Sequence, residues 1–485
     1  MKASRQTTAS RCNRRDFIKA AALATGAVVF GVPAMLRGQN LNSKLNIAVI
    51  GAGGKGASDT DCCAAENIFA LCDADTDRCA DQLKKYPDAK FYRDFRQMFA
   101  EAGGSIDAVI VATPDHFHAI AESHAMRLGK HVYGQKPLAQ TIYEARYLRA
   151  LVHETGVVTQ MGNQGSAADG LRRAVECIQA GIIGPVREVY VWTNRPVWPQ
   201  GIDRPDGSDP VPETLDWDIW LGPAPVRPYK KGVYNPWNWR GWQDFGTGAL
   251  GDMACHTVNM PFRALNLGYP TEIEATDLGP MNKETYPLGS KIRFLFPATH
   301  KTLLHRHVAF NWYDGGRPDA KAPDGHDFSN KPPSHLLVDI EALLGEVPNS
   351  ACLLVGDHGK IFSPDDYGEQ FFIKLNDDKK FVHYKKHPVA TEAAIPQSIP
   401  RNPFKGGNDL RQHLEWIAAI KAGKPEQCYS RFAVGAQLTE IMLLGCVALR
   451  AGQKIEWDGP NMRATNCPEA AQFVKRDNRA GWVLA

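Results

Sequence analysis

The sequence predicts an α/β fold in which a parallel, doubly wound sheet precedes a larger α+β region with a mostly antiparallel sheet. Short apolar strands alternate with helical stretches from Asn46 to about Gln160. A glycine-rich turn follows the first of these strands directly. After about Gly165 the strands and the loops between them become longer, which indicates a second domain. We therefore expect domains at 44–165 and 166–485.

The first strand and its turn lie in Leu45–Gly56, which reads LNIAVIGAGGKG. The glycines have the spacing Gly-x-Gly-x-x-Gly of dinucleotide-binding turns. Gly51 allows the tight turn, Gly53 lets the backbone approach a pyrophosphate, and Gly56 lets the next helix pack close to the strand. The pyrophosphate would then meet free N–H groups at the start of that helix.

The second strand, Ile68–Cys72, ends at Asp73. An acid at this position can bond a ribose 2′-hydroxyl and repel a 2′-phosphate, which favours NAD over NADP. The alternative is that Asp73 and Asp75 only cap the next helix. The candidate cofactor residues in this part of the chain are Gly51, Gly53, Gly54, Lys55, Gly56 and Asp73.

The third clear strand, Ile106–Ala112, runs into a predicted turn at Thr113–His118. This turn would lie at the carboxyl edge of the sheet, where open α/β sheets bind ligands. A helix is predicted at Ala119–Leu128, followed by the segments Lys130–Gly134 and Gln135-Lys136-Pro137. The last strand of the domain is predicted at Val157–Gln160.

The second domain begins with a helix at Leu171–Ala180 and a strand at Val186–Trp192. Further strands and C-terminal helices are predicted at Ile292–Phe296, Thr302–Trp312, Phe371–Leu375, His413–Ala422 and Ala433–Ala448.

Residues 1–43 have the pattern of a twin-arginine signal peptide and linker. Arg14-Arg15 precede Phe17, a short apolar run, Ala20–Phe30, and small residues. The run is too short to span a membrane comfortably. The twin-arginine machinery exports folded proteins, so the mature chain is expected in the periplasm with its cofactor already bound. The alternative is an uncleaved basic anchor.

The composition excludes some classes of function. The 485 residues carry a formal charge of +3 with acids and bases interspersed, which gives no indication of a nucleic-acid partner. Ten of the eleven cysteines follow Cys12, without the spacing of a disulfide framework or a zinc site. Free, mostly buried thiols and no metal site are therefore expected.

Four features stand in order along the chain: the glycine turn with Asp73, Thr113-Pro114 with His118, Lys136-Pro137, and Gly251–His256. In this order they resemble the Gfo/Idh/MocA oxidoreductases, named for glucose–fructose oxidoreductase and inositol dehydrogenase. The resemblance covers most of the chain after the signal. The twin-arginine start and two more motifs resemble the exported branch of carbohydrate-degrading bacteria: Trp217–Pro223 and Asn311–Gly316.

This resemblance implies a Rossmann domain and a second domain whose open sheet supports substrate and oligomer contacts, as a dimer or tetramer. The implied chemistry is NAD(P)-dependent oxidation or reduction at a sugar or cyclitol carbon, with tightly bound NAD. The family's lysine, aspartate and histidine form its catalytic group, which places those roles on Lys136, Asp252 and His256. The resemblance adds further cofactor-binding candidates: Thr113, Pro114, His118, Gln135 and Lys136.

The residues themselves suit alcohol oxidation, in which a base takes the hydroxyl proton as hydride leaves. Histidine titrates near neutrality and suits that base. Asp252 and His256 are four apart and share one face of a helix, so the acid can orient the imidazole. Lys136 can hydrogen-bond the reacting oxygen. The alternatives are a core histidine satisfied by Asp252 and a solvated surface lysine.

Two positions depart from the family pattern. Gln135 replaces the usual glutamate, which removes a charge beside Lys136 and can change the lysine's pKa or role. Asn259 replaces an aspartate found in many members. His116 and His118 either line the nicotinamide end of the pocket or are turn residues bonded to the backbone.

The segment Asn194–Phe245 interleaves six tryptophans with prolines and glycines. Aromatic faces can stack on sugar rings, although such segments more often pack on themselves. The substrate-binding candidates are Trp237, Trp239, Arg240 and Tyr313.

Three functions compete at this point. The first is an exported NAD-dependent sugar or cyclitol dehydrogenase, or an oxidoreductase that recycles its own NAD. The second is an NAD-retaining glycosidase or lyase that oxidises a sugar carbon transiently and eliminates the aglycone. The third is a non-catalytic sugar-binding protein, for which Gln135 is the only support.

Overall fold

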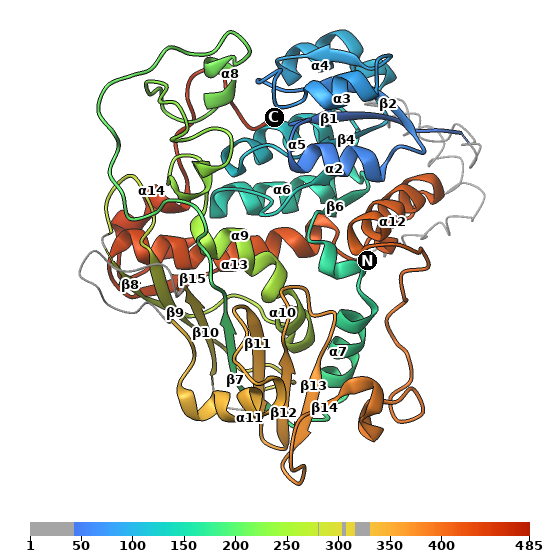
Figure 1. The fold of residues 1–485 in the computed structure, drawn as a ribbon, viewed down its shortest axis with the longest axis vertical. Helices are drawn as coiled ribbons and strands as arrows, with labels where there is room; N and C mark the ends of the chain where they lie inside the picture. The colour runs from blue at the N-terminus through green and yellow to red at the C-terminus, as the bar shows by residue number, and fades with distance from the viewer. Residues whose placement is uncertain (1–42, 280, 303–306, 316–329) are drawn as a thin grey trace, which may run out of the picture. The chain divides into compact units, whose positions relative to one another are not determined.

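The computed structural model describes residues 43–279, 281–302, 307–315 and 330–485. All of the predicted signal segment except Ser43 lies outside these residues. Within the described ranges the chain forms a six-stranded sheet and a ten-stranded sheet (Figure 1). Every pair in the first sheet is parallel, and the second is mostly antiparallel, which confirms the predicted fold class.

The parallel sheet has the order β3-β2-β1-β4-β5-β6. Its central strands read as continuous apolar runs because helices cover both faces. Helices α4, α5 and α6 pack on one face, and α2, α3 and α12 lie on the other. The elements are β1 (Asn46–Ile50), α2 (Lys55–Cys62), β2 (Asn67–Cys72), α3 (Ala80–Lys85), β3 (Lys90–Tyr92), α4 (Phe95–Ala102), β4 (Ala108–Val111), α5 (Asp115–Arg127), β5 (His131–Gly134), α6 (Ile142–Thr155), β6 (Thr159–Met161) and α12 (Asn408–Ala422).

The second sheet has the order β14-β13-β12-β11-β7-β10-β9-β8-β15-β16, and only its β7–β10 pair is parallel. The predicted strand Thr302–Trp312 begins at Val308 in the structure, and residues 303–306 lie outside the described ranges. The strands are β7 (Val186–Trp192), β8 (Glu272–Leu278), β9 (Gly289–Phe296), β10 (Val308–Asp314), β11 (Ala351–Gly356), β12 (Gly359–Ser363), β13 (Phe372–Leu375), β14 (Val382–His383), β15 (Ile455–Asp458) and β16 (Arg463–Ala464).

Helix α13 (Phe432–Ala451) lies between the two sheets and contacts α6, α9 and β8 (Figure 1). It is long and apolar enough to cross a membrane, but 83% of its apolar window is buried inside the protein, as in a core helix. The remaining helices are α7 (Asp169–Gln179), α8 (Trp217–Leu221), α9 (Gly248–Thr257), α10 (Asn259–Leu265), α11 (Ser334–Leu344) and α14 (Ala471–Val474).

The predicted turn at Thr113–His118 is wrong in its second half. Helix α5 begins at Asp115, so His116 and His118 are helical. Pro114 immediately precedes the helix and Asp115 lies in its first turn, where a carboxylate interacts favourably with the helix dipole. The carboxyl edge of β4 therefore presents Ala112, Thr113 and Pro114 as loop residues.

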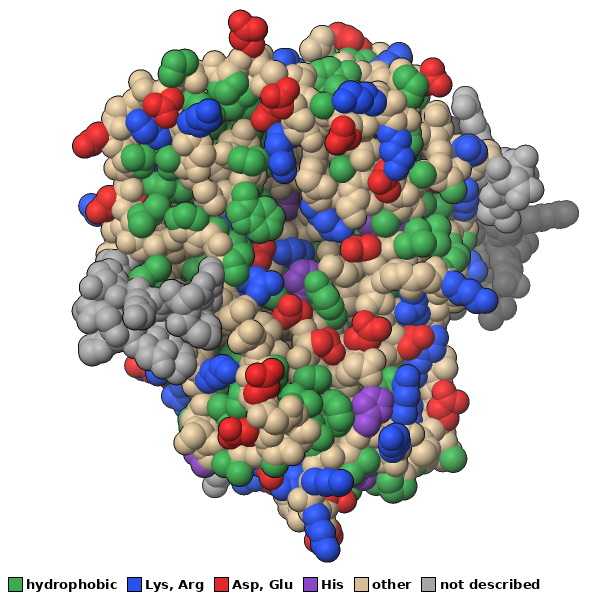
Figure 2. All heavy atoms as spheres, viewed as in Figure 1, with side chains coloured by type: hydrophobic (Ala, Val, Ile, Leu, Met, Phe, Trp, Pro, Cys, Tyr) green, Lys and Arg blue, Asp and Glu red, His purple; other side chains and the backbone are tan. Residues whose placement is uncertain are grey.

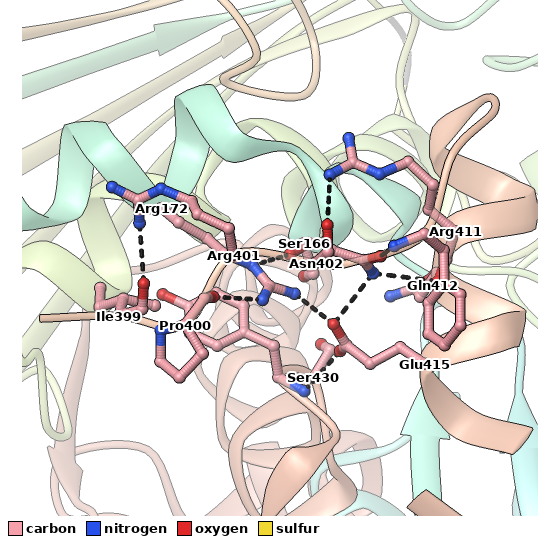
Figure 3. A network of polar contacts seen from close by, with 12 residues as sticks. Ser166, Arg172, Ile399, Pro400, Arg401, Asn402, Arg411, Gln412, Glu415 and Ser430 are labelled. Atoms are coloured by element: carbon pink, nitrogen blue, oxygen red, sulfur yellow. Dashed lines mark hydrogen bonds and ion pairs between the residues drawn. The ribbon is translucent and has the colours of Figure 1, made fainter. Parts of the chain in front are cut away.

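A buried polar network joins α7 to α12 and to the segment before α12 (Figure 3). Glu415 accepts hydrogen bonds from Nη2 of Arg172 at 2.5 Å and from Nδ2 of Asn402 at 3.0 Å. Arg172 also donates to the carbonyl of Pro400 at 2.6 Å. Buried charges are stable only when paired. The network holds α12 in place, and its Trp416 is fully buried against the parallel sheet.

The neighbouring acid Glu176 should make the stability of this region depend on pH under acid conditions. Burial alone would raise its pKa, but hydrogen bonds from Arg401, Ile399 and Arg173 lower that pKa to about 2. Its stabilisation is therefore complete above the unfolded pKa, near 4.5, and is lost as the pH falls through about 2. Glu176→Gln should lower the free energy of unfolding by about 3 kcal/mol at pH 7. The free energy of unfolding of the variant should also fall less than that of the wild type as the pH drops (the acid limb of the profile). Urea unfolding at several pH values measures this. An unchanged acid limb would contradict it.

Candidate active site

A pocket lies at the carboxyl edge of the parallel sheet, with a volume of about 1130 Å³ when the open space at its mouth is included. Figure 2 shows a hollow near the middle of the drawn face, with basic, acidic and histidine side chains around it. Every predicted cofactor residue except Gly56 lines the pocket. These residues are Gly51, Gly53, Gly54, Lys55, Asp73, Thr113, Pro114, His118, Gln135 and Lys136.

The glycine turn leaves no room for side chains. Gly51 has φ +82°, and a Cβ there would lie 2.8 Å from the carbonyl oxygen of Ala112. A Cβ on Gly53 would lie 2.6 Å from the carbonyl oxygen of Arg78, and one on Gly56 would lie 1.8 Å from that of Gly51. The turn thus exposes bare backbone to the pocket at the start of α2, which fits a pyrophosphate.

Asp73 lies at the end of β2 and faces the glycine turn. Its carboxylate accepts hydrogen bonds from the backbone N–H of Gly53 at 2.9 Å and of Asp75 at 3.0 Å. Burial raises the pKa of Asp73 to about 6. The capping alternative is wrong, because α3 begins after Cys79 and has no side-chain cap.

The segment Asn194–Phe245, which we call the clasp, closes one side of the pocket. It binds the loop after β2: Thr76 N–H donates to Thr214 O at 3.0 Å, and Asp216 N–H to Ala74 O at 2.8 Å. Nδ2 of Asn235 also donates to Asp75 at 3.2 Å. The clasp residues that line the pocket are Ile219, Trp220, Asn235, Pro236, Trp237, Trp239 and Arg240. Its other aromatic side chains pack on one another.

Two cations meet one carboxylate in the cluster of Lys136, Arg240 and Asp252. Nζ of Lys136 donates to Oδ1 of Asp252 at 2.7 Å and to its backbone oxygen at 2.9 Å. Nε of Arg240 reaches the same Oδ1 at 3.3 Å. Burial alone would raise the pKa of Asp252, but the two cations hold it well below its usual range. Asp252 is therefore ionised and fixes both cations.

The predicted Asp252–His256 pair is wrong as a hydrogen bond. Both residues lie on α9, but Asp252 is committed to Lys136 and Arg240. Among the described residues, Nδ1 of His256 has no hydrogen-bond partner, and its ring meets that of Tyr367 edge-on at 5.2 Å. His256 is buried, which with the nearby charge of Lys136 lowers its pKa to about 3. Its imidazole is neutral at pH 7.

The side chain of Gln135 bonds to helix α2 and not to Lys136. Its Nε2 donates to Oδ2 of Asp59 in α2 at 2.7 Å. Lys55 reaches the other oxygen of Asp59 at 2.9 Å, and all of Asp59 is buried. An amide suits this position because a glutamate would face a buried carboxylate. Asn259 is likewise buried and bonded, to Ser166 at 2.9 Å.

Gln135→Glu should therefore destabilise the protein, although it restores the family's usual residue. Two buried carboxylates would face each other, and the lost hydrogen bond adds to the cost, in total about 2 kcal/mol. Because the new acid must protonate to be buried, the loss should grow as the pH rises. Thermal unfolding at pH 6 and pH 8 measures this loss of stability. Gln97→Glu, at an exposed position of α4, is the control. Equal stability of Gln135→Glu and the wild type at pH 8 would contradict it.

The ring nitrogens of His118 meet two backbone carbonyls, those of Pro137 and Thr113, both at 2.7 Å. His118 thus joins the loop after β5 to the loop after β4. His116 contacts the carbonyl of Trp220 in the clasp at 3.2 Å. Both histidines bond to backbone, which is one of the two roles considered for them.

The substrate candidates separate in the structure. Trp237, Trp239 and Arg240 line the pocket, and Trp237 is 50% exposed. Tyr313 does not belong with them, since it lies on β10 beside Lys291 and Arg293, on a different surface of the second sheet. The alternating pattern of its strand gave no information on which face pointed to the pocket.

The motifs in the sequence did not predict three residues of the site, Asp59, Asp115 and Thr247. Asp115 lines the pocket and bonds Thr247, and Asp59 bonds Gln135. The position of Asp115 directly after Thr113-Pro114 was the one available signal. In the ranges that the structure describes, no group of three or more His, Cys, Asp and Glu can hold a metal ion.

Comparisons with known proteins identify two family regions. Residues 45–163 match the family model described as "Oxidoreductase family, NAD-binding Rossmann fold". Residues 192–267 match the model described as "Oxidoreductase family, C-terminal alpha/beta domain". The first contains the glycine turn and Lys136. The second contains the clasp, Asp252 and His256.

Individual proteins are similar over smaller or more divergent regions. A levoglucosan dehydrogenase of Pseudarthrobacter phenanthrenivorans is 24% identical over 44% of this chain and 50% of its own. A glycosyl hydrolase family 109 protein of Streptomyces niveus is 33% identical over 24% of this chain and 25% of its own. The chain thus spans half or less of the length of the curated relatives it matches. An inositol dehydrogenase homologue of Azotobacter vinelandii, solved with NADH and myo-inositol, shares the fold (TM-score 0.55, 14% identity, 86% and 98% coverage).

Proposed function

Because this chain belongs to the Gfo/Idh/MocA oxidoreductase family, we propose that it is an NAD-dependent oxidoreductase acting on a secondary hydroxyl of a sugar, cyclitol or sugar derivative. One observation carries the proposal: the dinucleotide turn lines the same pocket as Lys136 and Arg240, the two cations that bind Asp252. The relatives include sugar and inositol dehydrogenases, which supports this substrate class.

The residues of the pocket fit NAD. The bare backbone of Gly51–Gly54 would hold the pyrophosphate, and Asp73 would bond the adenosine ribose. Thr113 and Pro114 lie on the way from this turn to Lys136, at the carboxyl edge of β4. Bound NAD would supply the acceptor for a hydride.

The polar cluster would then handle the substrate's hydroxyl group. Lys136 has three N–H donors and uses two of them on Asp252, which leaves one for the reacting oxygen. Asp252 stays ionised and keeps the lysine in place. The neutral imidazole of His256 would accept the hydroxyl proton. Its Nδ1 is sealed from solvent and has no hydrogen-bond partner among the described residues, so the proton would go to Nε2.

The clasp supports tight retention of the cofactor. It bonds to the loop that carries Asp73 and covers the pocket with Trp237 and Asn235. We propose that these contacts slow the release of a bound dinucleotide. Retention also fits the proposed twin-arginine export to the periplasm, because free NAD is scarce outside the cytoplasm. We further propose a homodimer or homotetramer, as the family resemblance implies.

A second candidate is an NAD-retaining glycosidase or lyase, which the similarity to a glycosyl hydrolase family 109 protein favours. Such an enzyme would oxidise one sugar carbon and thereby acidify the proton on the neighbouring carbon. Loss of that proton would expel the aglycone from the carbon beyond, water would add to the resulting double bond in a glycosidase, and the hydride would return to the oxidised carbon. The same clasp would serve it, since the cofactor is restored in each cycle. The non-catalytic alternative loses its support because Asp59 accounts for Gln135.

The test is product analysis without added cofactor. The purified protein is denatured to identify bound nucleotide, and the intact protein is incubated with sugars and glycosides before mass spectrometry. A ketosugar, stoichiometric with bound NAD or continuing when an acceptor sugar is added, supports the oxidoreductase. Cleaved aglycone with unchanged NAD favours the glycosidase. A protein that holds no nucleotide and binds none on addition contradicts both.

A further inference from the structure

Asp115 joins the two domains beside the pocket. It is the first residue of α5, lines the pocket and is 4% exposed. Its Oδ2 accepts a hydrogen bond from Oγ1 of Thr247 at 2.6 Å. Thr247 immediately precedes α9, the helix that carries Asp252 and His256. One short hydrogen bond therefore links the carboxyl edge of the parallel sheet to the start of the helix that holds Lys136.

The position of the Thr247 side chain depends on Gly251. A Cβ on Gly251 would lie 2.0 Å from Oγ1 of Thr247, so any side chain there would displace the hydroxyl. The backbone N–H of Gly251 also donates to the carbonyl of Thr247 at 3.2 Å. This gives a physical reason for the glycine directly before Asp252: it leaves space for the hydroxyl that bonds Asp115.

Charged and titratable groups from several elements face Asp115. Lys136 after β5 and Arg240 of the clasp attract its negative charge, and Asp252 of α9 repels it. Tyr286, Cys255 and Cys446 lie near it from the loop before β9, from α9 and from α13. Burial raises the pKa of Asp115 to about 7, against the hydrogen bond from Thr247 and the two cations.

We propose that Asp115 is a positioning residue that, through Thr247, holds the start of α9 and with it Asp252 against Lys136. The inference rests on the proposed function, since Lys136 and Asp252 act there on the substrate. The ionised carboxylate is the stronger acceptor for the hydroxyl of Thr247. Protonation weakens this bond, so turnover should fall as the pH drops through the pKa of Asp115.

Three variants test the proposal in the purified NAD-containing protein. Asp115→Asn keeps an acceptor for Thr247 but cannot ionise, Thr247→Val removes only the hydroxyl, and Thr247→Ser restores it. Misplacement by a fraction of an ångström should lower kcat about tenfold to a hundredfold in the first two, with little change in KM or bound NAD. Asp81→Asn is the matched control, an acid in the first turn of α3 with a fully exposed side chain.

The pH profile of kcat separates positioning from a general loss of structure. In the wild type, kcat should fall as the pH drops below about 7, and Asp115→Asn should lose this pH dependence. Thr247→Val should lose this pH dependence as well, because the hydrogen bond through which Asp115 acts is absent, and Thr247→Ser should restore it. The same pH dependence in all variants, or unchanged kcat in Asp115→Asn, would overturn the proposal.

Infrared difference spectra keep the test independent of turnover. Between pH 6 and pH 8 the wild type should lose more protonated-carboxyl absorption than Asp115→Asn, in which Asp73 still titrates, and the excess should titrate at higher pH in Thr247→Val. A wild type that oxidises none of the sugars and glycosides is a failure of the proposed function, and these spectra then decide the inference alone. Equal losses of absorption in the wild type and Asp115→Asn overturn it.

Discussion

Lys136→Met should lower turnover about a thousandfold while bound NAD stays in place. The methionine keeps the length of the side chain but removes the only donor that would meet the reacting oxygen from this position. The glycine turn and Asp73, which would hold the cofactor, contact neither Lys136 nor its partners by hydrogen bond. Steady-state rates with a turned-over sugar, and nucleotide released on denaturation, measure the two effects.

Lys84→Met serves as the control, because Lys84 lies on α3 of the same domain with 80% of its side chain exposed. Its turnover should match the wild type. If Lys136→Met keeps more than a tenth of the wild-type rate, Lys136 does not meet the reacting oxygen. If it loses its NAD, the lysine acts chiefly in cofactor binding.

Asp252→Asn should have the second largest effect, on both stability and turnover. The carboxylate accepts from Lys136 and Arg240, whose side chains are each 17% exposed, while its own is 14% exposed. A neutral amide leaves two largely buried cations without their partner, which should cost about 3 kcal/mol. The freed lysine loses its orientation, so turnover should fall about a hundredfold. Thermal unfolding and steady-state kinetics measure these losses.

A surface pair provides the comparison for this variant. Asp218 also binds an arginine, Arg479, but 73% of its side chain is exposed. Asp218→Asn should change stability by less than about 1 kcal/mol and leave turnover unaltered. Equal melting temperatures of Asp252→Asn and Asp218→Asn would contradict the account of the cluster.

The fold class and the cofactor pocket could be predicted because they depend on local signals. The run from Leu45 to Gly56 combines a buried strand with glycines whose spacing has a steric cause, and the structure shows that cause at each glycine. The acid at Asp73 follows its strand directly. Such features are contiguous in sequence, so one sequence is enough to find them.

The errors concern contacts between distant segments. Asp252 binds Lys136, which lies 116 residues earlier in the chain, and not His256, which lies one helical turn away. The side chain of Gln135 is oriented by its hydrogen bond to Asp59 of α2, and not by its neighbour Lys136. The face of β10 that carries Tyr313 depends on the packing of the second sheet. Periodicity and spacing carry no information about any of these pairings.

The central claim is that a sugar carbon bearing a hydroxyl group would give its hydride to a nicotinamide held in this pocket, while the hydroxyl loses its proton to a base. Rapid mixing of the purified NAD-containing protein with each sugar, followed by the absorbance of reduced nicotinamide, tests it most directly. We expect the reduced band to appear in a single turnover of the wild type, and about a thousandfold more slowly in Lys136→Met. A wild type that converts a sugar or glycoside with no reduced nicotinamide at any time would contradict the claim.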